Sequence, residues 1–258
     1  MKGKQLIFFI NVFIFAILTS SSVEATIVRI ETNQGMIDVN LYDNGTPQTV
    51  ANFLAYVNNG DYSNSIIHRS VPGFIIQGGG FAYNGGWPAV NVFTDASVTN
   101  EPVYANVRGT IAMAKLANDP NSATNQWFFN LADNRSNLDN QNGGFTVFGE
   151  VVGSGMTVVD QIAALQRYNF GGVYTDIPLA NYDGTSDPTD SNLVIISSIS
   201  ILDSTVNTAA SLNPSLNNSS TAGGSSGGSD GGSSGGGTIG FLMIALLLMM
   251  RAIKIPKL

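Results

Sequence analysis

The sequence contains no cysteine and a single histidine, His68, among its 258 residues. Without cysteine, disulfide bonds and thiolate metal sites are excluded, and no redox compartment can be inferred from cysteine pairing. A lone histidine beside an apolar run is more typical of a structural hydrogen-bonding residue than of a base or a metal ligand. Because no nucleophile motif accompanies His68, a hydrolase triad built on it is not supported.

Positive charge is also scarce. The chain has 11 Lys and Arg against 18 Asp and Glu, which gives a net charge of −7, and its basic residues form no cluster. A partner with a phosphate backbone is therefore not expected, and nucleic acid binding is set aside. The acidic residues Asp183, Asp187 and Asp190 do not have the spacing of a helix–loop–helix calcium site, so they are interpreted as a polar surface loop.

Neither end of the chain has an apolar run of the roughly 20 residues that a membrane-spanning helix needs. Lys2 and Lys4 precede a shorter apolar run that ends at Leu18, and a polar stretch with small residues follows up to Ala25. This order predicts a cleaved secretory signal peptide over residues 1–25. The alternative that stays open is an uncleaved membrane anchor.

The carboxyl-terminal part of the chain is rich in serine, asparagine and glycine over residues 204–238, a composition that predicts a flexible linker. Residues 239–258 form a short apolar segment with a basic end. This order resembles the glycine-glycine carboxy-terminal sorting signal of some Gram-negative bacteria, which a rhomboid-type protease is thought to remove. A permanent tail anchor is the alternative, since a short helix can still sit in a bilayer at some cost.

The region between these ends, residues 26–203, is predicted to be one mainly β domain. Residues 26–31 and 35–41 alternate apolar and polar side chains around a turn, which indicates a hairpin. Thr46 at the N-cap, Pro47 at the first position and Gly60 at the end predict one helix. A second helix is predicted over Met156–Leu165, and short apolar runs predict further strands at 74–77, 110–114, 127–131, 145–148 and 193–202. Many strands and two helices favour a closed antiparallel barrel.

Four short motifs carry the functional information. They are IIHRSVPGFIIQGGGF (66–81), RGTIAMAK (108–115), SATNQWFFN (122–130) and FTVFGEVV (145–152). In this order they resemble the cyclophilins, a family of peptidyl-prolyl cis-trans isomerases, and most of all the bacterial periplasmic branch. The resemblance implies a closed antiparallel eight-stranded barrel capped by two α-helices. It also implies isomerisation of X-Pro bonds in proline-containing polypeptides without any cofactor.

The resemblance implies catalytic roles for Arg69, Phe74 and Gln77. Twisting an amide frees the lone pair of its nitrogen, so a fixed cation that donates a hydrogen bond there stabilises the transition state. Arginine suits this role because it stays charged and presents its donors in a rigid fork. Gln77 would bind the backbone of the substrate, and the wider set of implied substrate-binding positions is His68, Ile75, Met113, Ala114, Lys115, Gln126, Phe128, Asn137, Leu138 and Phe145.

Within this set, Phe74, Ile75, Phe128 and Leu138 are expected to form the apolar pocket for the proline ring. Ala114, the backbone of Lys115 and Gln126 are expected to line the peptide groove. On an alternating strand, the neighbours of Phe128, Trp127 and Phe129, should point the opposite way and pack in the barrel.

The chain departs from the family at two positions. Eukaryotic cyclophilins that bind cyclosporin tightly carry tryptophan where this chain has Asn137 and histidine where it has Phe145. Both positions lie at the mouth of the implied proline pocket, so the departure bears on drug affinity more than on catalysis. The segment 134–144, which includes Asn137 and precedes Phe145, is more polar than is usual in the family, so its contacts are not inferred by analogy.

The function predicted from the sequence is an exported folding catalyst in the periplasm or at the cell surface of a Gram-negative bacterium. It would be attached to the membrane at least transiently through the carboxyl-terminal segment, and its processing partners would be signal peptidase and a rhomboid-type protease. Two alternatives belong to other classes: a proline-peptide binding module or holdase with incidental turnover, and a structural surface barrel. The retention of Arg69, Phe74 and Gln77 together favours the enzyme.

Overall fold

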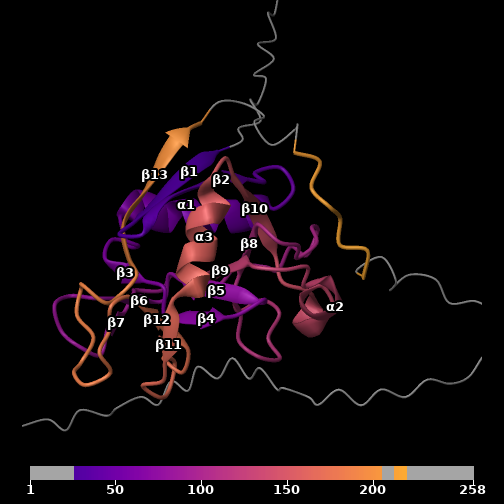
Figure 1. Ribbon diagram of the computed structural model, residues 1–258. Helices are drawn as coiled ribbons and strands as arrows, with labels where there is room; N and C mark the ends of the chain where they lie inside the picture. The colour runs from indigo at the N-terminus through magenta and orange to yellow at the C-terminus, as the bar shows by residue number, and fades with distance from the viewer. Residues whose placement is uncertain (1–25, 205–211, 220–258) are drawn as a thin grey trace, which may run out of the picture.

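The computed structural model describes residues 26–204 and 212–219 (Figure 1). The predicted signal peptide, most of the predicted linker and the whole apolar segment 239–258 lie outside these residues. Within the two described ranges, no helix combines the length and the apolar character needed to cross a membrane.

Strands dominate the structure (Figure 1). An antiparallel sheet runs in the order β4-β5-β9-β8-β10-β2-β1-β13-β3-β6-β7, and β11 and β12 form a separate hairpin. The strands are β1 (Ile27–Thr32), β2 (Gly35–Leu41), β3 (Ser65–Ile66), β4 (Arg69–Val71), β5 (Ile75–Gly78), β6 (Phe81–Ala82), β7 (Val90–Asn91), β8 (Thr110–Met113), β9 (Trp127–Asn130), β10 (Val147–Val152), β11 (Gln166–Tyr168), β12 (Ile177–Leu179) and β13 (Ile195–Asp203).

The sheet closes through one stretch of chain, residues 65–71. Its first half, β3, pairs with β13, and its second half, β4, pairs with β5. Between them, the Ile67 amide donates to the Val194 carbonyl at 3.0 Å and the His68 amide donates to the Gln77 carbonyl at 3.1 Å. Counted as one strand, this stretch completes the predicted eight-stranded barrel with β1, β2, β5, β8, β9, β10 and β13, while β6 and β7 extend one margin. The predicted fold class is confirmed.

The barrel interior is the main hydrophobic core, and two helices contribute to it. They are α1 (Pro47–Asn59) and α3 (Gly155–Ala164), close to the predicted bounds. Phe53 and Val57 of α1 and Val159 and Ile162 of α3 are buried in the same cluster as the inward side chains of β1, β2, β8 and β9. The turn predicted between residues 26–31 and 35–41 also forms, at Asn33 and Gln34, since β1 and β2 pair from Thr32 and Gly35 outward.

The start of α1 differs from the prediction. Thr46 occupies the N-cap position but makes no side-chain capping hydrogen bond. The Glu101 carboxylate takes that role: it accepts hydrogen bonds from the Gln48 amide at 3.2 Å and from the Thr49 amide at 2.9 Å. A carboxylate satisfies these free amides and lies at the positive end of the helix dipole, so it replaces the threonine hydroxyl. The predicted end at Gly60 is confirmed by its positive φ of 74°.

Two short helical turns interrupt the segment 134–144, for which the sequence predicts no structure. They are α2 (Arg135–Leu138) and the 3-10 turn η1 (Gln141–Gly143). The hairpin of β11 and β12 is likewise unpredicted, and it belongs to a separate aromatic cluster that includes Phe81 and Tyr174.

Residues 212–219 depart from the predicted flexible linker. The Asn217 amide donates to the Val103 carbonyl and the Ala105 amide donates to the Ser215 carbonyl, both at 2.9 Å. These main-chain bonds hold residues 212–219 on the barrel, beyond the boundary predicted at residue 203.

Candidate active site

An apolar pocket lies on the face of the sheet opposite the barrel interior. It is bounded by β4, β5 and β9 on one side and by α2 and η1 on the other. Its lining residues are Arg69, Phe74, Ile75, Gln77, Ala114, Phe128, Asn137, Leu138, Gln141 and Phe145. The structure therefore brings together all three predicted catalytic residues and the four residues predicted to hold a proline ring.

The alternation of side chains along β9 places Phe128 in this pocket. Phe128 is 2% exposed and packs with Ile75 and Leu138, whereas Trp127 and Phe129 belong to the barrel core. The rings of Phe128 and Phe145 lie edge to face with centroids 5.9 Å apart. This placement agrees with the predicted division between pocket and core, because successive residues of a strand face opposite sides.

A row of polar side chains forms the rim of the pocket. Arg69, Gln77 and Phe128 are opposite one another across β4, β5 and β9. Arg69 Nη1 lies 3.5 Å from Gln77 Oε1, and Gln77 Nε2 donates to Gln126 Oε1 at 2.8 Å. Gln77 is buried and both ends of its amide are occupied, so it holds Arg69 and Gln126 in place.

Arg69 is half-buried. Burial lowers the pKa of its guanidinium, and the nearby Asp176 carboxylate acts in the opposite direction. Within the described residues Arg69 forms no ion pair. An arginine stays protonated at neutral pH even when partly buried, so the pocket rim carries a positive charge that no carboxylate within residues 26–204 and 212–219 contacts directly.

A second hollow continues from the pocket at Ala114, which lines both. This second hollow has a larger volume than the pocket, and its lining includes Gly80, Lys115 and Gln126. A Cβ atom at Gly80 would lie 2.6 Å from the Gln126 side chain, so a glycine there leaves room for Gln126 to reach Gln77. The residues predicted to line the peptide groove, Ala114, Lys115 and Gln126, all line this hollow.

The side chain of Lys115 has a position that the sequence does not predict, since only its backbone was expected at the groove. Its ammonium donates to the Gly144 carbonyl at 2.6 Å, the Asn142 carbonyl at 2.9 Å and Asn100 Oδ1 at 3.1 Å. It also lies 4.8 Å from the centre of the Phe145 ring. Lys115 therefore fixes the segment that carries Phe145.

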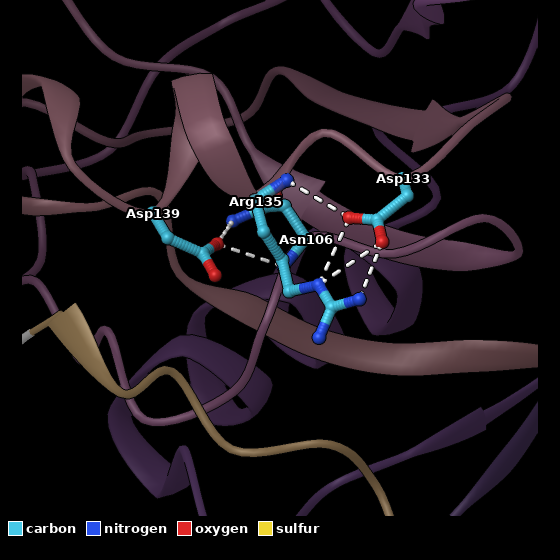
Figure 2. A network of polar contacts seen from close by, with 4 residues as sticks. All are labelled: Asn106, Asp133, Arg135 and Asp139. Atoms are coloured by element: carbon cyan, nitrogen blue, oxygen red, sulfur yellow. Dashed lines mark hydrogen bonds and ion pairs between the residues drawn. The ribbon is translucent and has the colours of Figure 1, made fainter.

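A buried polar network supports α2 beneath the pocket. Asn134 Nδ2 donates to the Phe74 carbonyl at 2.9 Å and to Asn130 Oδ1 at 2.7 Å. The Asp139 carboxylate accepts hydrogen bonds from the amide and the side chain of Asn106 at 2.8 and 2.9 Å (Figure 2). At the surface, Arg135 pairs with Asp133 in the same view. These contacts join both walls of the pocket to the barrel.

Lys115 and Gln126 line the second hollow and not the pocket, and two other predicted substrate-binding residues line neither of them. Met113 is completely buried in the barrel core, because it precedes Ala114 and faces the other side of the sheet. His68 is 2% exposed and packs edge to face on Phe81 at 4.8 Å. Burial lowers the pKa of His68 to about 3, so its ring is neutral at physiological pH.

Gln141 lines the pocket although it was not predicted to do so. It lies in η1, and its side-chain amide donates to Asn137 Oδ1. Nothing in a polar segment with no regular period distinguishes this glutamine from its neighbours. In residues 26–204 and 212–219, no group of three or more histidine, cysteine, aspartate or glutamate residues is placed to hold a metal ion.

Comparison with known proteins gives one consistent family. The family model described as cyclophilin type peptidyl-prolyl cis-trans isomerase/CLD matches residues 27–183. A peptidyl-prolyl cis-trans isomerase of Acinetobacter baylyi is 41% identical over 165 residues, covering 63% of this chain and 84% of that protein. Peptidyl-prolyl cis-trans isomerase B of Escherichia coli is 40% identical over 162 residues, covering 58% of this chain and 92% of its own.

A solved structure is similar in fold. The cyclophilin type peptidyl-prolyl cis-trans isomerase of Cryptosporidium parvum matches with a TM-score of 0.50 and 24% identity, covering 69% of this chain and 98% of its own. At this identity the likeness supports the barrel architecture alone.

Proposed function

The chain belongs to the cyclophilin type peptidyl-prolyl cis-trans isomerases, and we propose that it accelerates X-Pro isomerisation in exported polypeptides through Arg69. The observation that carries this proposal is the position of Arg69, a half-buried cation that lines an apolar pocket together with Phe74 and Phe128. No proton transfer and no covalent step is required, because isomerisation makes and breaks no bond.

The proposed mechanism follows from the barrier to rotation. Amide resonance makes that barrier about 18–20 kcal/mol, so the uncatalysed step takes tens of seconds or more. Phe128, Ile75 and Leu138 hold the proline ring while the preceding carbonyl rotates. Arg69 then donates a hydrogen bond to the proline nitrogen, whose lone pair is available in the twisted state and delocalised in the planar one. The contact therefore lowers the energy of the transition state more than that of the ground state.

Replacing Arg69 with alanine tests this role. We expect kcat/KM for an X-Pro peptide to fall at least about a hundredfold, the scale of losing one charge-assisted transition-state contact. Arg167→Ala is the matched control, because Arg167 is an exposed arginine on β11, away from the pocket residues. A protease-coupled isomerisation assay measures the rates, and thermal unfolding checks that both variants fold.

The kinetic and binding measurements distinguish catalysis through Arg69 from peptide binding without catalysis. If Arg69→Ala keeps most of the wild-type activity with an unchanged unfolding midpoint, the role given to Arg69 is wrong. If the wild type binds a proline peptide but does not accelerate its isomerisation, the protein is a binding module or holdase.

Export is a second part of the proposal, and the sequence of the two ends supports it. Signal peptidase would remove residues 1–25, and a rhomboid-type protease would cut within the glycine-rich stretch before Thr238. The mature isomerase would then act in the periplasm or at the cell surface of a Gram-negative bacterium, in the periplasmic branch of the family. A glycine-rich stretch before a short apolar segment favours such cleavage, because glycine allows the extended backbone that intramembrane proteases require.

Intact-mass analysis of the protein from its native host tests this processing. We expect the major species to begin near Thr26 and to end before Thr238. A major species that still contains Phe241–Leu258 would contradict cleavage and indicate a tail-anchored enzyme.

A further inference from the structure

Residues 212–219, here called the strap, lie beside α2 at the pocket side of the barrel, where Figure 1 shows them in orange-yellow. Their main chain pairs with residues 103–105: Leu216 forms an isolated antiparallel bridge with Tyr104. Two hydrogen bonds flank this bridge, from Asn217 to Val103 and from Ala105 to Ser215. The strap is thus held on the domain by one isolated bridge and two main-chain hydrogen bonds.

The strap reaches the pocket wall through one carbonyl group. Ser219 Oγ donates to the Asp139 carbonyl at 2.7 Å, and Asn217 Nδ2 lies 3.3 Å from the same oxygen. Asn217 is only 5% exposed, so this contact lies within the folded domain. Asp139 directly follows α2, the helical turn that carries Asn137 and Leu138.

Asp139 is therefore held from two directions. Its carboxylate accepts two hydrogen bonds from Asn106, which belongs to the loop that pairs with the strap (Figure 2). Its main-chain carbonyl accepts hydrogen bonds from the strap itself. The Phe145 amide in turn donates to the Leu138 carbonyl at 2.9 Å. A displacement of Asp139 would move both Leu138 and Phe145, which line the pocket.

Apolar packing adds a second connection between the strap and the pocket. Leu212 is partly buried against the cluster that contains Phe128, Leu138 and Val147. This cluster is shared with the pocket, so the strap contacts the pocket wall through a side chain as well as through the Asp139 carbonyl.

We propose that the strap is a positioning element of the active site: it holds α2 and the residues after it in the arrangement that grips a proline ring. Substrate affinity then depends on residues that follow the barrel in sequence. Because the contacts described above join the strap to Asp139 and to the apolar cluster of the pocket, its loss should raise KM and leave kcat nearly unchanged. The expected change in KM rests on the proposed function, whereas the expected change in hydrogen exchange does not.

The test uses the full-length chain with Ser219→Ala and with the double substitution Asn217→Ala/Ser219→Ala. Ser215→Ala is the matched control, because it removes an exposed hydroxyl from the same strap and keeps the carbonyl that binds Ala105. Ser219→Thr retains a hydroxyl and should restore the wild-type values. The measurements are hydrogen exchange of the peptide covering residues 135–140, the kinetic constants for an X-Pro peptide, and the unfolding midpoint.

We expect Ser219→Ala and Asn217→Ala/Ser219→Ala to speed hydrogen exchange at Leu138–Asn140 and to raise KM about threefold to tenfold, with kcat within twofold of wild type. Ser215→Ala should behave like the wild type. Unchanged exchange and unchanged KM in the double variant would overturn the proposal. Faster exchange throughout the barrel together with a lower midpoint would also overturn it, since that result describes a general stabiliser. Exchange is measured without substrate, so it tests the strap even if the isomerase assay fails.

Discussion

At the scale of single residues, the charge of Lys115 holds the segment that carries Phe145, a residue of the pocket wall. Lys115 is 3% exposed, and its ammonium is surrounded by the Asn142 and Gly144 carbonyls and by Asn100. Burial lowers the pKa of this ammonium to about 8. The nearby Asp119 carboxylate opposes this shift. The protonated form makes the charge-assisted hydrogen bonds and the cation–π contact with Phe145, and the neutral form lacks both.

This arrangement predicts that KM for an X-Pro peptide rises as the pH increases through 8, because the Phe145 segment loses its charged partner. Lys115→Met should raise KM several-fold at pH 7 and remove the dependence around pH 8. A pH series of isomerisation assays on both proteins measures this. The pH profile of Arg167→Ala should match the wild type, and an identical profile for Lys115→Met would contradict the role of the ammonium.

Deprotonation of Lys115 with rising pH acts on stability in the direction opposite to its effect on substrate binding. Since the pKa of Lys115 in the folded protein lies below the unfolded value of 10.5, the unfolded chain binds more protons between pH 8 and 10.5. The Lys115 contribution to the free energy of unfolding therefore increases as the pH rises across that window. Weaker substrate binding above pH 8 should not be accompanied by a loss of stability from this residue.

At the scale of elements, α1 depends on a carboxylate from a distant loop. Glu101→Gln should lower the free energy of unfolding by about 1 kcal/mol, because a neutral amide is a weaker partner for the amides of Gln48 and Thr49 and does not favour the helix dipole. This corresponds to about 2–4 °C in the unfolding midpoint for a domain of this size. Urea and thermal unfolding measure both quantities.

Glu31→Gln provides the control for Glu101→Gln. It removes the same charge from an exposed position on β1. Equal destabilisation by the two substitutions would show that Glu101 acts through net charge and not through the helix.

At the scale of the whole molecule, stability should decrease below pH 6.5 through the single histidine. The folded pKa of His68 is about 3 against an unfolded value of 6.5, because burial disfavours the charged ring and the neighbouring Arg69 adds to this effect. The unfolded chain thus binds the additional proton as pH falls, and the contribution present above pH 6.5 is progressively lost down to pH 3. Linkage gives a loss of about 2 kcal/mol between pH 7 and pH 5.

The substitution His68→Phe separates the contribution of His68 to the pH dependence of stability from that of the carboxylates, which also titrate in acid. Its ring would occupy the same site against Phe81. Urea unfolding of both proteins at pH 7 and pH 5 measures the difference. We expect a smaller loss of stability in the variant, and an equal loss in both proteins would show that His68 is not the group responsible.

Much of the fold and site was predictable because the signals are local. Pro47 and Gly60 mark the ends of α1 through backbone geometry, and the alternation at Trp127, Phe128 and Phe129 separates core from pocket. Most of the pocket residues lie in compact motifs, and the resemblance of these motifs to a family implies roles for them. Met113 illustrates the limit: it belongs to the same motif as Ala114, but its side chain faces the barrel core.

The sequence by itself determined the mainly β class and the two main helices, because these follow from periodicity and capping residues, and the resemblance of its short motifs to the cyclophilins implied most of the residues around Arg69. Only the tertiary structure decided that Glu101 caps α1, that Lys115 holds the Phe145 segment and that residues 212–219 bind Asp139. These contacts join residues separated by 52, 29 and 80 positions. No local pattern encodes them, since hydrogen bonds between distant segments exist only after the barrel has closed and placed those segments side by side.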